Sequence, residues 1–321
     1  MKKSFLALST VVFAATSAAQ RLQLDPKLPP YVKTRNLTGN LNSIGSDTMN
    51  NLMTLWAEAF RKHHPAVRVQ VEGKGSSTAP PALLAGTAQL GPMSRTMKDS
   101  EVDAIVEKLG FEPTAVVAAL DVLAVYVNCN NPLNSLSIPE VDAIFSKTRR
   151  LGFERNLSTW GQLGLSGDWA RKPISLYGRN AASGTYGFFK DHALGGGDFK
   201  DSVKEQPGSA SVVQGVSEDL FGMGYSGIGY ATTGVKALAL ASKPGEQAYE
   251  ATYENALQGK YPLSRSLYIY VTKDPRKPWD PLVAEFLRFV LSRQGQEVVV
   301  KDGYLPLTAS MVEEQLAALF Q

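Results

Sequence analysis

The chain has 321 residues, enough for two domains, and its 44% hydrophobic and 20% charged residues are typical of a globular protein. The formal net charge of +3 at pH 7 argues against a polyanionic partner, so we expect no nucleic acid. A single cysteine excludes a disulfide framework and a cysteine-based metal site. We expect neither a cofactor nor a metal.

The first 19 residues predict a cleavable signal peptide. Lys2 and Lys3 precede an apolar stretch, and small residues at positions 17–19 suit cleavage before Gln20. No other stretch approaches the ~20 apolar residues that a membrane helix needs, and no cysteine follows the cleavage position to carry a lipid. We therefore expect a periplasmic protein without a membrane anchor, acting as a monomer. Residues 20–40, which contain several prolines, predict an extended lead-in.

From residue 41 onward, short apolar runs alternate with helical patterns, as in an α/β protein with parallel strands. We expect strands at 41–44, 67–71, 120–127, 173–177, 227–231 and 266–271, and helices at 49–62, 80–84, 139–145, after Ser183, and at 281–291, 294–300 and the C-terminus. The interpretation is a fold of two α/β lobes, each a mixed sheet flanked by helices. Residues 41–122 plus 268–321 form lobe 1 and residues 123–267 form lobe 2, with a ligand cleft between them.

The first chemically informative turn follows the apolar residues near position 41. Gly45 leads through Ser46, Asp47 and Thr48 into a helix whose apolar residues have helical spacing. The polar cluster therefore lies at the positive end of the helix dipole, where it either binds an anion or caps the helix.

A second turn of similar composition follows the alternating valines of residues 67–71. Residues 73–78 read Gly-Lys-Gly-Ser-Ser-Thr and lead into a helix with prolines in its first turn. This turn again offers hydroxyls and backbone N–H groups at the start of a helix.

The third turn, residues 178–185, is the most informative. We expect Gly178 to break the preceding strand and Ser183, Gly184 and Thr185 to open the next helix. Helix N-termini attract anions, and the guanidinium of Arg179 matches a tetrahedral oxyanion. A shared site for phosphate or sulfate explains three such turns in one chain better than three unrelated helix caps do.

Four motifs, in this order, resemble the periplasmic phosphate-binding proteins of ABC-type phosphate importers. They are residues 44–49, 75–78, 91–95 (Gly-Pro-Met-Ser-Arg) and 178–185, and the similarity covers roughly residues 41–310 with the closing segment 303–307. The resemblance implies a type II periplasmic binding protein that holds one phosphate between its lobes and presents it to a membrane permease.

The resemblance also implies a set of phosphate ligands. Hydroxyls, backbone N–H groups and arginines would come from all four motifs. The predicted ligand-binding residues are Asp47, Thr48, Met49, Ser76, Ser77, Ser94, Arg95, Arg179, Ser183, Gly184 and Thr185.

Two positions depart from the family pattern. The best-known members have aspartates where Arg95 and Ala181 stand here; the first accepts the proton of phosphate and the second pairs with the binding arginine. Sulfate carries no proton near neutral pH, so an acceptor is what distinguishes phosphate. We hypothesise that Asp47 takes this role and that Arg95 faces the anion or pairs with Asp47, while Asn180 orients Arg179. The alternative is that Asp47 only caps the helix of residues 49–62.

Two other functions use the same chemistry. A secreted phosphatase would also stabilise a phosphoryl group with arginine and helix-end donors. The three histidines, His63, His64 and His192, lack metal-ligand spacing with acidic residues, so we assign no catalytic residue and expect no enzyme activity. The other alternative is a binding protein for sulfate, molybdate or another oxyanion, which Arg95 and Ala181 favour.

Overall fold

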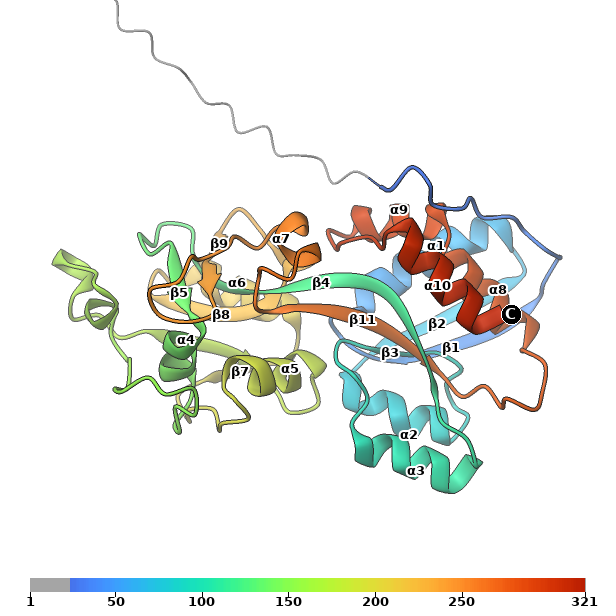
Figure 1. Ribbon diagram of the computed structural model, residues 1–321, viewed down its shortest axis with the longest axis horizontal. Coiled ribbons are helices and arrows are strands. Elements are labelled where there is room, and N and C mark those ends of the chain that lie inside the picture. Colours follow the sequence, from blue (N-terminus) through green and yellow to red (C-terminus); the bar gives the residue numbers. More distant parts are fainter. Residues whose placement is uncertain (1–23, 321) are drawn as a thin grey trace, which may run out of the picture.

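The structure, a computed structural model, describes residues 24–320 and consists of two lobes joined by two long strands (Figure 1). The predicted signal peptide lies outside the described residues. Each lobe has its own hydrophobic core, as expected for two α/β units packed side by side. Within residues 24–320, no helix is long and apolar enough to cross a membrane.

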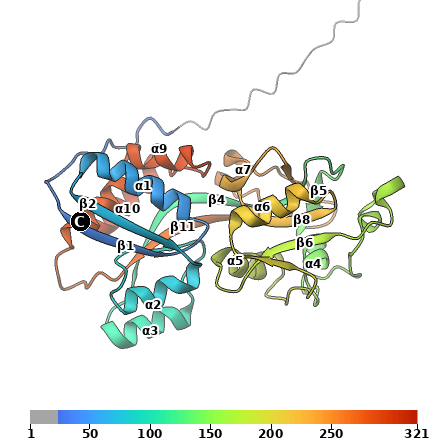
Figure 2. The same cartoon turned by 180° about the vertical axis from the view of Figure 1, so that it is seen from behind.

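The first lobe contains the first and last of the described residues, drawn in blue, cyan and red in Figure 1. Strands β1 and β2 pair in parallel, and β1 also touches the start of β3 through a bridge between Ser43 and Leu90. Helices cover both sides, with α1 beside β1 and β2 in the reverse view (Figure 2). Its elements are β1 (Gly39–Gly45), α1 (Asn50–His63), β2 (Val67–Gly73), α2 (Ala79–Leu84), β3 (Gly91–Met93), α3 (Asp99–Leu109), α8 (Pro281–Val290), α9 (Arg293–Lys301) and α10 (Ala309–Phe320).

The second lobe is formed by the middle of the chain. Its strands β6, β7 and β8 are parallel. Helix α5 follows β6 along the chain and α6 follows β7, so the N-terminus of each helix comes after the end of a strand. Its elements are β5 (Ser135–Ser137), α4 (Ile138–Phe145), β6 (Ser175–Arg179), α5 (Gly184–Ala193), β7 (Lys204–Gln206), α6 (Ser209–Glu218), β8 (Gly222–Gly227), β9 (Val235–Ala237), β10 (Ala239–Ala241) and α7 (Tyr253–Leu257).

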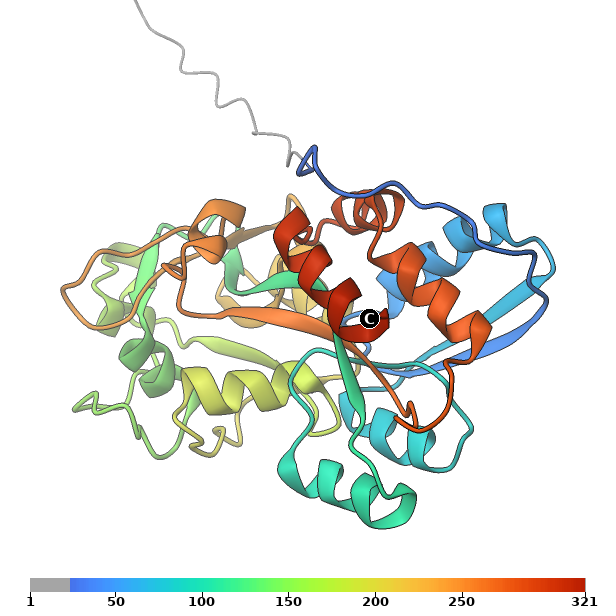
Figure 3. The ribbon, with the colours of Figure 1, turned by 45° about the vertical axis from the view of Figure 1, so that its right-hand side comes forward.

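Strands β4 (Thr114–Asn128) and β11 (Ser264–Val271) run antiparallel from one lobe into the other. They join the lobes in one sheet of order β3-β11-β4-β8-β6-β7, with β9 beside β4. Val116 and Leu267 belong to the core of lobe 1, whereas Val122 and Leu263 belong to that of lobe 2. The predicted lobe boundaries therefore fall inside these two strands. Figure 3 shows α10 on the same lobe as α8 and α9, beside this crossing.

Most predicted elements are confirmed. In α1 the apolar spacing buries Leu52, Met53, Trp56 and Phe60 against α8 and α9, and basic residues occupy its last turn, where they oppose the helix dipole. The expected strands near residues 67–71 and 266–271 and the helices near 139–145 and 281–291 form with nearly the predicted bounds.

Two expectations about strands are wrong. Gly178 does not break β6 but lies within it, because pairing with β7, where its register partner is Glu205, outweighs the weak strand propensity of glycine. The strand expected at 227–231 lies earlier, at Gly222–Gly227, and a single 3-10 turn follows. The predicted mixed sheet is confirmed, since β4 pairs antiparallel with β8, β9 and β11 while β6 pairs in parallel with β7 and β8.

The lead-in between residues 24 and 38 has no helix or strand and packs on lobe 1 through the buried Glu285 of α8. The Glu285 carboxylate accepts hydrogen bonds from the Tyr31 hydroxyl (2.7 Å) and from the backbone and hydroxyl of Thr34 (3.0 and 2.5 Å). These hydrogen bonds lower the pKa of Glu285 although burial opposes its ionisation. The segment is thus fixed to lobe 1 by a charged group.

Candidate functional site

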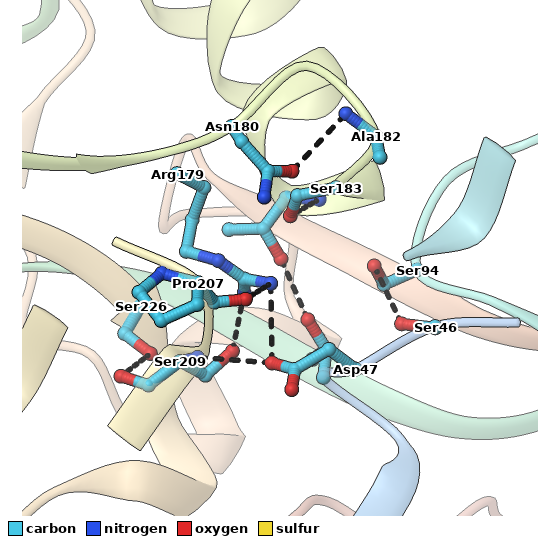
Figure 4. Close-up of polar contacts among 12 residues, drawn as sticks. Ser46, Asp47, Ser94, Arg179, Asn180, Ala182, Ser183, Pro207, Ser209 and Ser226 are labelled. Atoms are coloured by element: carbon cyan, nitrogen blue, oxygen red, sulfur yellow. Dashed lines mark hydrogen bonds and ion pairs between the residues drawn. The ribbon is translucent and has the colours of Figure 1, made fainter. Parts of the chain in front are cut away.

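The three polar turns meet between the lobes: Figure 4 shows the turns after β1 and β6 facing each other, and backbone hydrogen bonds join the turn after β2 to both. The turn after β1 carries Asp47 and Thr48, the turn after β2 carries Ser76, and the turn after β6 carries Ser183 to Thr185. Each follows the carboxyl end of a strand, which is where ligands of α/β proteins bind. Four of the predicted ligand residues, which must share one site for the prediction to hold, are all buried there: Thr48, Ser76, Arg179 and Thr185.

Asp47 contacts the opposite lobe and does not cap its own helix. Its Oδ2 lies 3.1 Å from Nη2 of Arg179 and accepts the backbone N–H of Ser209 at 2.9 Å. Ser209 is the first residue of α6, so the Asp47 carboxylate satisfies an N–H at the positive end of that helix. No side chain caps α1. The capping alternative for Asp47 is therefore wrong for α1.

Arg179 is held at the end of β6 by groups from both lobes. Besides Asp47, its Nη1 donates to the Ser209 hydroxyl at 2.7 Å, while its Nη2 lies 3.4 Å from the Pro207 carbonyl oxygen. The Nε group is buried and has no hydrogen-bond partner among the described residues. Burial lowers the pKa of Arg179, and the Asp47 carboxylate opposes this shift. The expected partner Asn180 instead accepts the N–H of Ala182 at 3.2 Å, within its own loop.

Thr48 and Thr185 bring hydroxyls from opposite lobes together. Their Oγ1 atoms lie 2.7 Å apart. The carbonyl of Thr48 accepts hydrogen bonds from two tyrosine hydroxyls, Tyr230 at 3.2 Å and Tyr304 at 2.8 Å. The position of Thr48 is therefore fixed from both lobes. The side chain of Met49 belongs to the core of lobe 1, so only its backbone faces the turn.

Ser76 and Ser94 lie beside the start of α5. The N–H of Ser94 donates to Ser76 Oγ at 3.1 Å, and Ser46 Oγ donates to Ser94 Oγ at 3.1 Å. A Cβ on Gly184 would lie 2.2 Å from Ser76 Oγ and 2.7 Å from Ser94 Oγ, so only glycine permits this approach of the lobes. The N–H of Ser77 donates across the cleft to the Ala182 carbonyl at 3.1 Å.

The N-terminus of α5 points its backbone N–H groups at the same place. Ser183 is its N-cap, and its hydroxyl accepts the N–H groups of Thr185 and Tyr186 at 3.1 and 3.4 Å. Gly184, the first residue of the helix, has no intrahelical partner for its N–H. This N–H, the buried hydroxyls and Arg179 form a cluster of donors suited to an oxyanion.

Arg95 does not pair with Asp47. Its guanidinium makes two hydrogen bonds to Glu101 at 2.8 and 2.7 Å and one to the Ser77 hydroxyl at 3.2 Å. Burial opposes the ionisation of Glu101, but the hydrogen bonds from Arg95 and from the Lys98 N–H lower its pKa. The cause is local, because Glu101 of α3 is only six positions away and forms a bidentate pair.

Residues that contact the site but were not predicted include Ser209, Tyr230, Arg265 and Tyr304. Ser209 at the start of α6 resembles the other helix starts, and this was the only available signal. Arg265 also lines an interlobe groove of about 680 Å³, together with Arg95, Phe188 and Tyr268. Among the residues that the structure describes, no group of acidic, histidine or cysteine side chains could hold a metal ion.

Comparison with known proteins identifies the family. A model of the PBP superfamily domain matches residues 30–294. Phosphate-binding protein PstS of Pseudomonas aeruginosa is 54% identical over 319 residues, which cover 99% of both chains. The chain belongs to the PstS family. Protein SphX of Synechococcus elongatus is 30% identical over 269 residues, 83% of this chain and 77% of SphX.

Solved structures show the same fold. A putative phosphate ABC transporter substrate-binding protein of Clostridium perfringens, with bound phosphate, matches with a TM-score of 0.71 at 24% identity, covering 84% of this chain and all of that one. An ABC-type phosphate transport receptor of Vibrio cholerae matches with a TM-score of 0.65 at 23% identity, with 83% and 100% coverage. The expected type II periplasmic binding protein fold of PstS proteins is therefore confirmed.

Proposed function

We propose that this protein captures inorganic phosphate between its lobes in the periplasm and delivers it to the membrane permease of an ABC transporter. Membership of the PstS family supports this function, as does the full-length similarity to a relative named as a phosphate-binding protein. In this proposal the leader is removed as a signal peptide, and the mature chain acts as a monomer.

The observation that carries the proposal is the composition of the cluster between the lobes. Buried Arg179 with its unused Nε, the N-terminus of α5 and the hydroxyls of Thr48, Ser76 and Thr185 are donors, and a single carboxylate, Asp47, is an acceptor. Donors replace the water shell of an oxyanion, and a carboxylate accepts a hydrogen bond from the protonated oxygen of monohydrogen phosphate. The proposed ligands are the predicted residues other than Arg95, whose contact with the anion stays a prediction.

The proposal requires no bond to be broken. The PstS relatives are named as binding proteins rather than enzymes, which supports a carrier. In the alternative, a secreted phosphatase on this scaffold, a phosphoryl ester would occupy the same donors.

Calorimetric titration of the purified, anion-free protein tests the function. We expect tight binding of phosphate, much weaker binding of sulfate and molybdate, and no hydrolysis of a chromogenic phosphate ester. Equal or tighter binding of sulfate would show that the ligand is another oxyanion and not phosphate. Turnover of the ester would show that the protein is a phosphatase and not a carrier. Phosphate-dependent capture of the permease in reconstituted vesicles tests the partner.

A further inference from the structure

Arg265 of β11 contacts binding loops of both lobes, although no motif singled it out. Its side chain is 2% exposed. Its Nη1 donates to the Ser94 carbonyl of lobe 1 at 2.9 Å, and its Nη2 donates to the Thr185 hydroxyl of lobe 2 at 3.1 Å. It therefore reaches the proposed phosphate site from the strands that connect the lobes.

Asp121 holds Arg265 in this position. The two residues are direct partners in the β4–β11 ladder. The Asp121 Oδ2 accepts from Nε at 2.8 Å and lies 2.7 Å from Nη2, and Asp121 is fully buried. The carboxylate cancels the charge of the guanidinium, so Arg265 adds little net positive charge to the site. The contribution of Arg265 to the site is therefore the direction in which its N–H groups point.

That direction determines how the Thr185 hydroxyl is used. A guanidinium has donors but no acceptor, so the Thr185 oxygen must accept from Arg265. The hydroxyl proton then points away from Arg265 and is free to be donated toward Thr48 Oγ1, 2.7 Å away, or toward an anion bound beside the two hydroxyls. Without the hydrogen bond from Arg265, the Thr185 hydroxyl rotates and also turns its oxygen lone pairs toward the anion. Lone pairs repel an oxyanion and do not bind it.

We propose that Arg265 is a positioning residue for phosphate capture, which acts by holding the Thr185 hydroxyl as a donor to the anion. This inference rests on the proposed function. It also assigns the buried Asp121–Arg265 pair a role in ligand affinity in addition to its role in joining the two crossing strands.

A double-mutant cycle on phosphate affinity tests the inference. The variants are Arg265→Lys, Thr185→Val and the two combined, with Thr185→Ser as the change that keeps the hydroxyl. We expect each single change to weaken phosphate binding about tenfold or more, and the combined variant to bind about as weakly as Thr185→Val alone. In the Thr185→Ser background, Arg265→Lys should still cost about tenfold.

A purely structural role of Arg265 predicts a different pattern. In the combined variant, the fold-losses of phosphate affinity caused by Arg265→Lys and by Thr185→Val would then multiply. The melting temperature of the phosphate-free protein would fall together with the affinity. The matched control is Arg276→Lys, because Arg276 also pairs with an aspartate, Asp274, but lies exposed on the surface of lobe 1. We expect that control to leave phosphate affinity unchanged.

The outcomes separate the two proposals. If the native protein binds phosphate and the losses multiply, the role of Arg265 is overturned and the proposed function stands. If the native protein binds no oxyanion, both are overturned. If Arg265→Lys fails to fold, Asp121→Asn replaces it in the cycle with Thr185→Val. This change keeps the shape of the side chain that holds Arg265. The expected pattern and the contradicting pattern are the same as for Arg265→Lys.

Discussion

Asp47 of lobe 1 and Arg179 of lobe 2 meet across the cleft, with 3.1 Å between the carboxylate Oδ2 and the guanidinium Nη2. The pair supplies the partner that Arg179 lacks at position 181, where this chain has alanine. It also places the one acidic side chain among the proposed phosphate ligands next to the cationic one. As an ionised carboxylate at this position, Asp47 is the proposed hydrogen-bond acceptor for the protonated oxygen of a bound phosphate.

We expect Asp47→Asn to weaken phosphate binding about tenfold or more, ~1.4 kcal/mol, while sulfate affinity changes little. The amide retains the shape of the side chain but loses the charge that favours a protonated anion over an unprotonated one. Calorimetric titration with both anions measures the ratio. Asp274→Asn is the control, because Asp274 also pairs with an arginine, Arg276, but lies away from the cleft. An unchanged preference for phosphate in Asp47→Asn would exclude Asp47 as the acceptor.

We expect Gly184→Ala to prevent close approach of the lobes. The added methyl group would lie 2.2 Å from Ser76 Oγ, and relieving such overpacking typically costs about 1–3 kcal/mol, or roughly tenfold to hundredfold in affinity. Gly187→Ala is the matched control in the same helix, since its Cβ would meet only the flexible Arg95 side chain at 3.3 Å. Phosphate titration and small-angle scattering of both variants check this, and normal affinity in Gly184→Ala would contradict it.

Arg95→Ala should affect stability more than phosphate affinity. The guanidinium is committed to Glu101, so we expect the dissociation constant to change by less than about threefold and the free energy of unfolding to fall by about 1 kcal/mol at pH 7. Because Arg95 lowers the pKa of Glu101, its stabilisation is present above the unfolded pKa of that carboxyl and is lost as pH falls through the folded one. Urea unfolding at pH 7 and pH 3 tests the stability change. A large loss of phosphate affinity would instead make Arg95 a ligand.

Asp302→Asn should stabilise the protein at neutral pH. Burial raises the pKa of Asp302 to about 6, and a hydrogen bond from Asn51 only partly offsets this. The folded state therefore holds the proton more tightly than the unfolded state, so the native chain loses stability as pH rises from about 4 to about 6. Allowing for partial exposure, we expect a gain of about 1 kcal/mol for the variant at pH 8 and none at pH 3. Unfolding curves at both pH values measure it; an equal gain at both would exclude the titration of Asp302.

Elements whose signal is local could be predicted from the sequence. The apolar spacing of α1 lies within one stretch of chain, and the Ser183 cap of α5 bonds residues two and three positions away. Gly178 shows the limit, because its place in β6 depends on pairing with β7, which follows later in the chain. Local propensity was overruled there by a neighbouring strand.

The partners within the site could not be predicted, since they depend on contacts distant in sequence. Asp47 bonds Ser209, 162 positions away, and Arg265 bonds Ser94, 171 positions away. Arg265 is one polar position in a strand pattern, which gives no sign that it points inward. Arg95 stands where the best-known family members have an aspartate, and the hypothesis that it faces the anion or pairs with Asp47 left out Glu101, which the nearby helix α3 supplies as its partner.

The connection through β4 and β11 restricts how the two halves of the molecule move. Both segments are strands bonded to each other along the crossing, not loose linkers, and twisting one half against the other would shear that ladder. Bending across the ladder preserves its hydrogen bonds, and the register shift between Leu267 and Tyr268 marks the irregular point along it. We therefore expect the halves to move by bending about β4 and β11, which would open the cleft at the edge opposite these two strands.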